Sequence, residues 1–290
     1  MTTQPVTSAS GSSSTTLSTE EIGRQIFQRR QKRQRRQRFI FLAIRLVSLA
    51  IVFTSWQIYG SHTIAILFAP ITTVLHQGYL LFAHNGLWGQ FLVSVETFGY
   101  GYLFGMLIGV FLGMLTGAYR AAEAAISMYI FALYATPMVA LVPIISLWVG
   151  YNFHAQVVIV TLFVVWPVTV TVFHGIREID PDLLEVSRSL RLNRRQTWLH
   201  VLLPGAVPFI ITGATQGVAM GLVGVIIAEV QTQLVGIGDA LQTQSSTYHT
   251  AAALAVILLI MALGLTLRFI LSLVKRWVVP WQRADQRRSN

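Results

Sequence analysis

The sequence predicts an all-α membrane protein with about six transmembrane helices and with both termini in the cytoplasm. Three observations support this fold class. The 290 residues are 54% hydrophobic and only 11% charged, whereas soluble domains are about 25% charged. The apolar residues are gathered into segments close to, or above, the length of about 20 residues that a helix needs to cross a bilayer. Finally, all 21 Lys and Arg residues fall on one predicted side of the membrane.

Residues 1–38 are predicted to form a disordered, basic cytoplasmic arm. Residues 1–19 are rich in Ser and Thr and have almost no apolar side chains with which to bury a core. The run RRQKRQRRQR follows at residues 29–38. Alone, such a run is also typical of an arm that binds RNA or directs targeting. Its place directly before an apolar span favours contact with anionic membrane lipid, with no nucleic acid as a partner.

The apolar segments define a transmembrane domain over residues 39–279, followed by a basic cytoplasmic tail at residues 280–290. With an inside N-terminus, the loops predicted to lie outside contain no Lys or Arg, which is the positive-inside pattern. A weaker patch at residues 64–82 contains Pro70, His76 and Gly78 and is interpreted as an external loop with short interfacial helices, a seventh span being the alternative. The predicted spans are 39–59, 91–118, 124–148, 155–172, 205–228 and 251–273.

Two spans carry glycines at helical spacing. Each interior Gly costs a helix about 1 kcal/mol relative to Ala, but aligned glycines allow another helix to approach closely. We therefore expect helix packing, against either another helix of this chain or a second protomer. The glycines are Gly101, Gly105, Gly109, Gly113 and Gly117 in the second span and Gly213, Gly217 and Gly221 in the fifth.

The third span contains Pro137 and Pro143, which bend a helix and leave backbone carbonyls unpaired. Such a helix is either a structural kink or a helix that bends around a translocation path. Glu229, at the end of the fifth span, either lines the outer mouth of a path or lies at the external interface. No Lys or Arg lies deep in any span, so an anionic solute would have to be held by backbone N–H groups, hydroxyls and aromatic edges.

The polar loop at residues 180–208 is predicted to contain two short helices with an elbow at residues 191–193. Asp180 and Pro181 are suited to begin the first helix, which reaches about Leu190. Leu183, Leu184, Ser187 and Leu190 are expected on one of its sides. Asn193 caps the second helix, residues 194–203, which Pro204 is expected to close.

This loop resembles the EAA loop of ABC-importer permeases, whose pattern is E-A-A, three residues, Gly, nine residues and I-x-L-P. The chain has Glu185-Val186-Ser187, then Arg191 in place of Gly, and ends with Val201-Leu202-Leu203-Pro204 at the same spacing. The Gly position suits a left-handed turn, in which a side chain costs about 1 kcal/mol.

Two further segments resemble one permease subfamily, which serves nitrate, bicarbonate, sulfonate or taurine, and thiamine-precursor pyrimidines. The first segment is P-x-x-A-x-x-P followed by an aliphatic run, Trp and Gly. The second is Ala-Glu, a short spacer and Gly-Ile-Gly. The matching residues are Pro137, Ala140, Pro143, Leu147, Trp148 and Gly150, then Ala228, Glu229, Gly236, Ile237 and Gly238.

The resemblance implies a type I ABC-importer permease fold in the bacterial inner membrane. It also implies a permease homodimer that assembles with cytoplasmic ATPase subunits and an extracytoplasmic solute-binding protein. It implies ATPase coupling through residues 176–204, with Arg194 and Arg195 at the rim of the contact. The coupling residues are Glu185, Val186, Ser187, Arg188, Leu190, Arg191 and Pro204. The expected translocation-path residues are Pro137, Pro143, Trp148 and Glu229.

Enzyme chemistry and cofactors find no support in the sequence. The chain has no Cys, its His residues lack metal-ligand spacing, and neither Lys32 nor Lys275 belongs to a phosphate-binding G-x-x-x-x-G-K-[ST] loop. We therefore expect no catalytic residue, no metal and no cofactor, with ATP hydrolysed by a separate subunit. A secondary transporter or channel that works alone, and a membrane scaffold without transport activity, are the alternatives.

Overall fold

The computed structural model describes residues 19–84 and 86–278, apart from the side chains of residues 19–36, 38, 184 and 188. This part of the chain contains helices and no strand, which confirms the predicted all-α class. It divides into two units, Met1–Tyr59 and Gly60–Asn290.

The first unit contains most of α1 (Thr19–His62), whose apolar part, Phe39–His62, is long enough to cross a membrane. The helix begins at Thr19, so residues 19–38, which the sequence predicts to be disordered, are helical in the structure. Glu, Gln, Arg and Lys have good helix propensity, and a helix propagates readily from an apolar span that is already formed. Residues 1–18 and the predicted tail at 280–290 lie outside the described residues.

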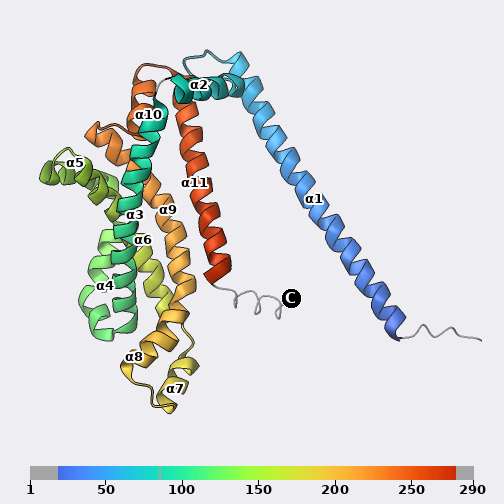
Figure 1. Cartoon of the computed structure of the whole chain (residues 1–290), viewed down its shortest axis with the longest axis vertical. Helices are drawn as coiled ribbons and strands as arrows, with labels where there is room; N and C mark the ends of the chain where they lie inside the picture. The colour runs from blue at the N-terminus through green and yellow to red at the C-terminus, as the bar shows by residue number, and fades with distance from the viewer. Residues whose placement is uncertain (1–18, 85, 279–290) are drawn as a thin grey trace, which may run out of the picture. The chain divides into compact units, whose positions relative to one another are not determined.

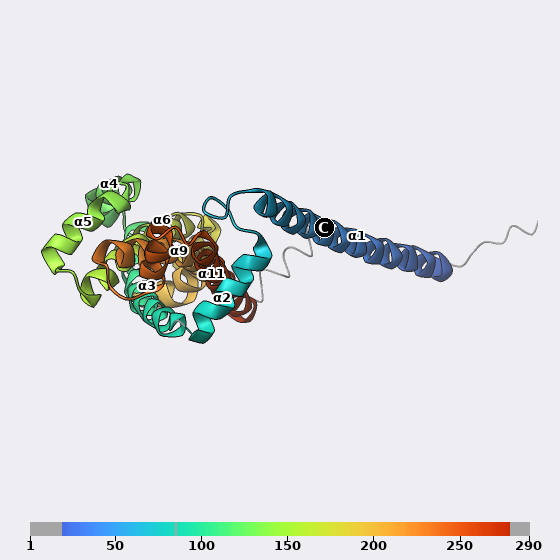
Figure 2. The same cartoon turned by 90° about the horizontal axis from the view of Figure 1, so that it is seen from above.

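The second unit is built around α3, α6 and α9, which pack along one another (Figure 1). Seen from above, α4 and α5 lie on one side of these helices and α2 and α11 on the other (Figure 2). The helices are α2 (Ile71–His84), α3 (Leu87–Ala118), α4 (Arg120–Ala135), α5 (Met138–Val149), α6 (Phe153–Arg177), α7 (Pro181–Ser189), α8 (Arg194–Thr197), the π-helix η1 (Trp198–Leu202), α9 (Leu203–Thr232), α10 (Ile237–Ser246) and α11 (Thr250–Val278).

Five of the six predicted spans are single helices in the described part of the chain, and each is longer than the sequence predicts at one end or both. The third is not. It consists of α4 and α5, which meet at a bend of 99°. The patch at residues 64–82 contains the 14-residue α2, which is shorter than the about 20 residues required for a crossing.

The glycine stripe of α3 packs against α6 of the same chain, which decides between the two partners that the sequence leaves open. A Cβ atom on Gly113 would lie 2.7 Å from both the carbonyl oxygen of Thr169 and Cβ of Val172, so only hydrogen fits there. Because lipid is as apolar as a side chain, close van der Waals contact of this kind, rather than the hydrophobic effect, holds such helices together. The five glycines face, in order, Val160, Val164, Val168, Val172 and Ile176.

The same valines of α6 also meet the glycines of α9, now in reverse order along the chain. Gly217 lies against Val164 and Val168, and Gly224 lies against Val160. Thus α3 runs parallel to α6, and α9 runs antiparallel to it. This relative direction is the one expected for the second, fourth and fifth crossings of the predicted topology.

Candidate functional site

The elbow between α7 and α8 forms where the sequence predicts it. The Asp180 carboxylate accepts a hydrogen bond from the backbone N–H of Asp182 at 2.9 Å and so caps the start of α7. At the other end, Arg191 has φ of 53°, and the N–H of Leu192 donates to the carbonyl of Ser187 at 3.0 Å. A left-handed residue followed by this six-residue closure is a Schellman motif, which ends a helix sharply. Asn193 then begins α8 with a capping box shared with Gln196.

The side of α7 that faces away from the chain carries apolar side chains. Leu183, Val186 and Leu190 are 52%, 54% and 68% exposed, and Glu185 is exposed beside them. Ser187, which the resemblance implies should face the ATPase, is instead only 3% exposed. The sequence predicts Leu183 and Ser187 on the same side of α7. In the structure Leu183 is on the exposed side and Ser187 is on the buried side. The side chains of Leu184 and Arg188 lie outside the described residues.

Pro204 does not close the second helix of the loop. Together, α8, η1 and α9 form one continuous span, Arg194–Thr232, and Pro204 lies in the first turn of α9. Just before it, the N–H of Leu203 donates to the carbonyl of Trp198, five residues back, in the wider turn of a π-helix. This wider turn accommodates a proline, which has no N–H and whose ring would collide with a carbonyl in a regular α-helix.

Two contacts join neighbouring helices at the end of the bundle where the elbow lies. The indole N–H of Trp198 donates to the hydroxyl of Tyr119 at 2.9 Å, between η1 and the junction of α3 with α4. Arg177 of α6 forms an ion pair with Glu123 of α4. Figure 1 places α7 and α8 at this end of the bundle and α2 and α10 at the other.

The broken span borders a cavity of about 560 Å³ near the middle of α6 and α9. The chain turns at Thr136 and Pro137, between α4 and α5. Gln216 of α9, an exposed amide within an apolar span, faces this cavity and accepts a hydrogen bond from the Thr171 hydroxyl at 2.6 Å. The cavity is lined by Tyr134, Thr136, Met138, Phe163, Trp166, Pro167, Gln216, Ala219 and Met220.

None of the residues expected to line a path is among those that line this cavity, although Pro137 separates two of the lining residues, Thr136 and Met138. Pro143 lies inside α5 and does not produce the break. Trp148 is 79% exposed near the end of α5, and neither residue lines this cavity.

Glu229 is fully buried, so it neither lines an outer mouth nor lies at an interface in this structure. Its Oε1 accepts from the Ser94 hydroxyl at 2.6 Å, and its Oε2 accepts from the N–H of Gly238 at 2.7 Å. The Ser94 oxygen also accepts from the N–H of Ile237 at 2.8 Å. We refer to Ser94, Glu229, Ile237 and Gly238 as the polar hub. It joins α3, α9 and the start of α10, and it satisfies a carboxylate whose burial is otherwise costly.

The polar hub also explains why two glycines follow Glu229 in the Gly-Ile-Gly segment. A Cβ on Gly238 would lie 2.7 Å from the carbonyl oxygen of Ile226 and 3.0 Å from Cβ of Glu229. A Cβ on Gly236 would overlap the Glu229 carboxylate itself. The segment is therefore a close-packing element at the start of α10.

A second buried chain of hydrogen bonds lies beside the polar hub. Gln156 of α6 donates through Nε2 to the Thr232 hydroxyl at 2.9 Å and accepts from the Thr97 hydroxyl at 3.4 Å. No sequence motif identifies these hydrogen-bonded residues, and none identifies Ser94 or Gln216. The available signal is an uncharged polar residue within an apolar span, since burial of such a group requires a partner or a cavity.

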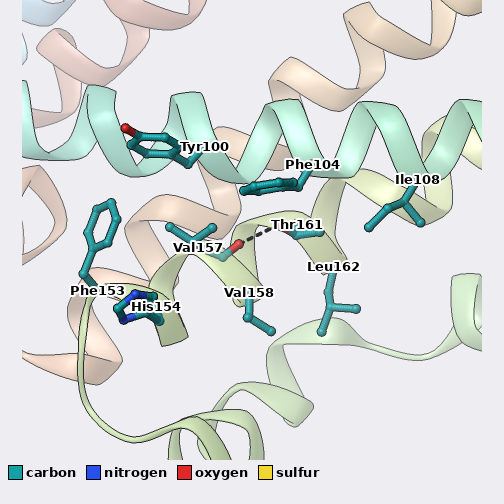
Figure 3. A pocket seen from close by; sticks show the side chains of 9 residues that line it. All are labelled: Tyr100, Phe104, Ile108, Phe153, His154, Val157, Val158, Thr161 and Leu162. Carbon is teal, nitrogen blue, oxygen red and sulfur yellow. Dashed lines mark hydrogen bonds between the residues drawn. The ribbon is translucent and has the colours of Figure 1, made fainter.

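A groove of about 510 Å³ lies between α3 and α6 on the surface of the single chain (Figure 3). Its lining is mostly apolar. The hydroxyl of Thr161 is satisfied within its own helix by the carbonyl of Val157 at 2.7 Å, and the rings of Tyr100 and Phe153 meet edge to face. The groove therefore offers apolar contact rather than recognition of a polar solute.

Comparison with known proteins supports the same assignment as this geometry. Residues 105–283 match the family described as binding-protein-dependent transport system inner membrane component. The putative aliphatic sulfonates transport permease protein SsuC of Escherichia coli (strain K12) is 32% identical over 204 residues, which are 70% of this chain and 78% of that protein. Its counterpart in Bacillus subtilis (strain 168) is 25% identical over 238 residues, 81% of this chain and 86% of that protein.

The fold matches a solved structure as well. A chain in the crystal structure of an amino acid ABC transporter with histidines superposes with a TM-score of 0.57 at 19% identity, covering 68% of this chain and 96% of that one. Because the family match covers more than half of the residues, the assignment does not depend on any single motif. The chain belongs to the family of inner-membrane components of binding-protein-dependent transport systems, the permease subunits of ABC importers.

Proposed function

We propose that this chain forms the translocation path of its importer and is driven by a separate ATPase that docks on α7. The continuous span Arg194–Thr232 supports this proposal most directly. It begins at the elbow that follows α7, passes the cavity at Gln216, and ends just after the buried carboxylate of Glu229. Movement imposed on α7 is therefore transmitted to the cavity by one rigid helix.

The exposed side of α7 is the proposed docking surface. An apolar row of Leu183, Val186 and Leu190 would bury its area in a groove of the ATPase, with Glu185 at its edge. The arginines Arg194 and Arg195 are exposed and are suited to rim contacts. Ser187 belongs to the inner side and is left out of this surface.

The coupling follows the logic of a two-state element. ATP brings two ATPase subunits together, each carries a docked α7 with it, and the attached spans reorient the path. The contact between Trp198 and Tyr119 then connects the moving elbow to the α3–α4 junction, close to the broken span.

Two protomers of this chain are proposed to enclose the path, with a solute-binding protein outside and membrane lipid around them. The solute is proposed to be small and anionic or polar. The named relatives are sulfonate permeases, and the sequence resembles a subfamily that serves nitrate, bicarbonate, sulfonate, taurine and pyrimidine precursors.

Affinity purification of the full chain in mild detergent tests the proposal. We expect a stoichiometric partner with a phosphate-binding loop, which Val186→Asp removes, because a carboxylate would be buried in an apolar groove. The matched control is Val235→Asp, an exposed valine in the turn after α9, which should retain the partner. A chain that purifies alone and moves solute into liposomes without ATP would instead be a secondary transporter.

A further inference from the structure

One polar side chain near the middle of the bundle is not enclosed by the helices around it. Gln216 lies close to the centre of α9, and its amide is exposed on the single chain. A polar amide in contact with lipid would cost several kcal/mol. Its exposure therefore indicates that it faces the cavity at the broken span, which it lines.

The contacts of this amide leave its donor end available. Gln216 Oε1 accepts from the Thr171 hydroxyl at 2.6 Å, whose proton is shared with the carbonyl of Pro167 at 2.8 Å. Among the described residues, no acceptor is bonded to Gln216 Nε2. The pair Thr171–Gln216 thus fixes the amide with its oxygen occupied and its two N–H groups unused.

Other donors border the same cavity. Within the described part of the chain, the indole N–H of Trp166 is buried and has no acceptor. The first turn of α5 begins at Met138, and Pro137 before it provides no side-chain cap. A helix start leaves N–H groups unpaired and carries partial positive charge. The lining contains no carboxylate and no Lys or Arg.

We propose that this cavity is a transient binding site for a small oxyanion, with Gln216 Nε2 as its main donor and Thr171 as the residue that positions the amide. The donors match the oxygens of a sulfonate, nitrate or carboxylate group. The absence of a fixed cation from the lining keeps binding weak, so that the anion can leave again. This proposal rests on the proposed function, since it assumes that solute passes the cavity.

The test uses the complete transporter, reconstituted with its ATPase and binding protein, with ethanesulfonate and nitrate as probes. Gln216→Leu should lower the maximal uptake rate at saturating binding protein at least about tenfold and leave ATP hydrolysis and assembly intact. Thr212→Val, one turn earlier on α9 and outside the cavity lining, removes an exposed hydroxyl that bonds within its own helix to the carbonyl of Pro208. It is the matched control and should retain uptake. Gln216→Glu should reduce uptake of both anions below that of Gln216→Leu, because a carboxylate repels them.

The outcomes separate the two proposals. Unchanged uptake by Gln216→Leu, or an undiminished rate with Gln216→Glu, overturns the oxyanion site. So does a loss of protomer–protomer assembly in Gln216→Leu with uptake per assembled complex intact, since Gln216 would then be an interface residue. If Gln216→Leu does not fold, Thr171→Val replaces it, and an unchanged uptake rate at equal ATP hydrolysis overturns the site. If the wild-type protein binds no ATPase partner, or shows no ATP-driven uptake, the proposed function itself is overturned.

Discussion

The Ser94 hydroxyl donates to the carboxylate of Glu229, 135 residues later in the chain, at 2.6 Å, and both side chains are buried. This contact attaches the start of α3 to the end of α9, where α10 also begins. It converts a carboxylate that the sequence places at a membrane boundary into a structural element.

Ser94→Ala should destabilise the protein by about 1–3 kcal/mol, because it leaves the N–H of Ile237 and one oxygen of Glu229 without a partner. Glu229→Gln should cost less, since the Ser94 hydroxyl can turn to the carbonyl of Gln90, 3.2 Å away. Thermal unfolding in detergent measures both. Glu96→Gln, an exposed acid on the same helix, is the control, and an equal loss in all three variants would contradict the assignment.

Gly113→Ala should cost about 1–3 kcal/mol, because the added Cβ would have to push α6 away from α3. Gly99→Ala on the same helix should be neutral or stabilising by up to about 1 kcal/mol, since nothing lies within 4 Å of its Cβ and Ala favours helix. Unfolding midpoints of the two variants give the comparison. Equal midpoints would mean that the stripe does not set the distance between the helices.

Arg191→Gly should fold and remain coupled, with stability within about 1 kcal/mol of the parent. Glycine removes the left-handed strain at φ of 53° but adds entropy to the unfolded chain. Arg191→Val should be less stable than Arg191→Gly by about 1 kcal/mol or more, since a branched side chain suits this conformation least. ATP-driven uptake and thermal unfolding test both variants. A collapse of assembly in Arg191→Gly would mean that the guanidinium makes a contact of its own.

Glu185→Lys should leave the protein inserted but uncoupled, with ATP-driven uptake reduced at least about tenfold by charge reversal at the edge of the docking surface. Glu178→Lys, an equal reversal at the end of α6, should retain uptake. Membrane fractionation verifies insertion in both. Normal uptake by Glu185→Lys would argue strongly against docking through α7.

Local rules and spacing are sufficient to predict the elbow. Asp180, Arg191 and Asn193 act through contacts with their own neighbours in sequence, and the structure places the cap, the left-handed turn and the second cap there. Pro204 is predicted wrongly because the same residue type can end one helix or begin the next. A proline can continue a helix here because the turn before it is the wide turn of a π-helix, η1.

Long-range contacts decide the features that the sequence leaves open. The partner of the α3 glycines is α6, and Ser187 is buried although it lies beside exposed leucines in the helical projection. Long-range packing also gives Glu229 and Gln216 different roles. One polar residue finds partners on α3 and α10, and the other meets a cavity, which only the packing of distant helices creates.

The π-helical turn η1 has a geometric consequence for the direction in which α7 points. A π-turn contains about one residue more than an α-turn, and each residue of an α-helix advances the backbone by about 100° around its axis. Because the wide turn takes up this extra residue within about one turn, the helix on either side of η1 keeps the direction it would have in a regular helix one residue shorter. The azimuth at which α7 meets its partner therefore depends on the wide turn itself. Regular winding of the same residues would rotate the docking helix by about 100° around the axis of α9 without altering any side chain on the docking surface.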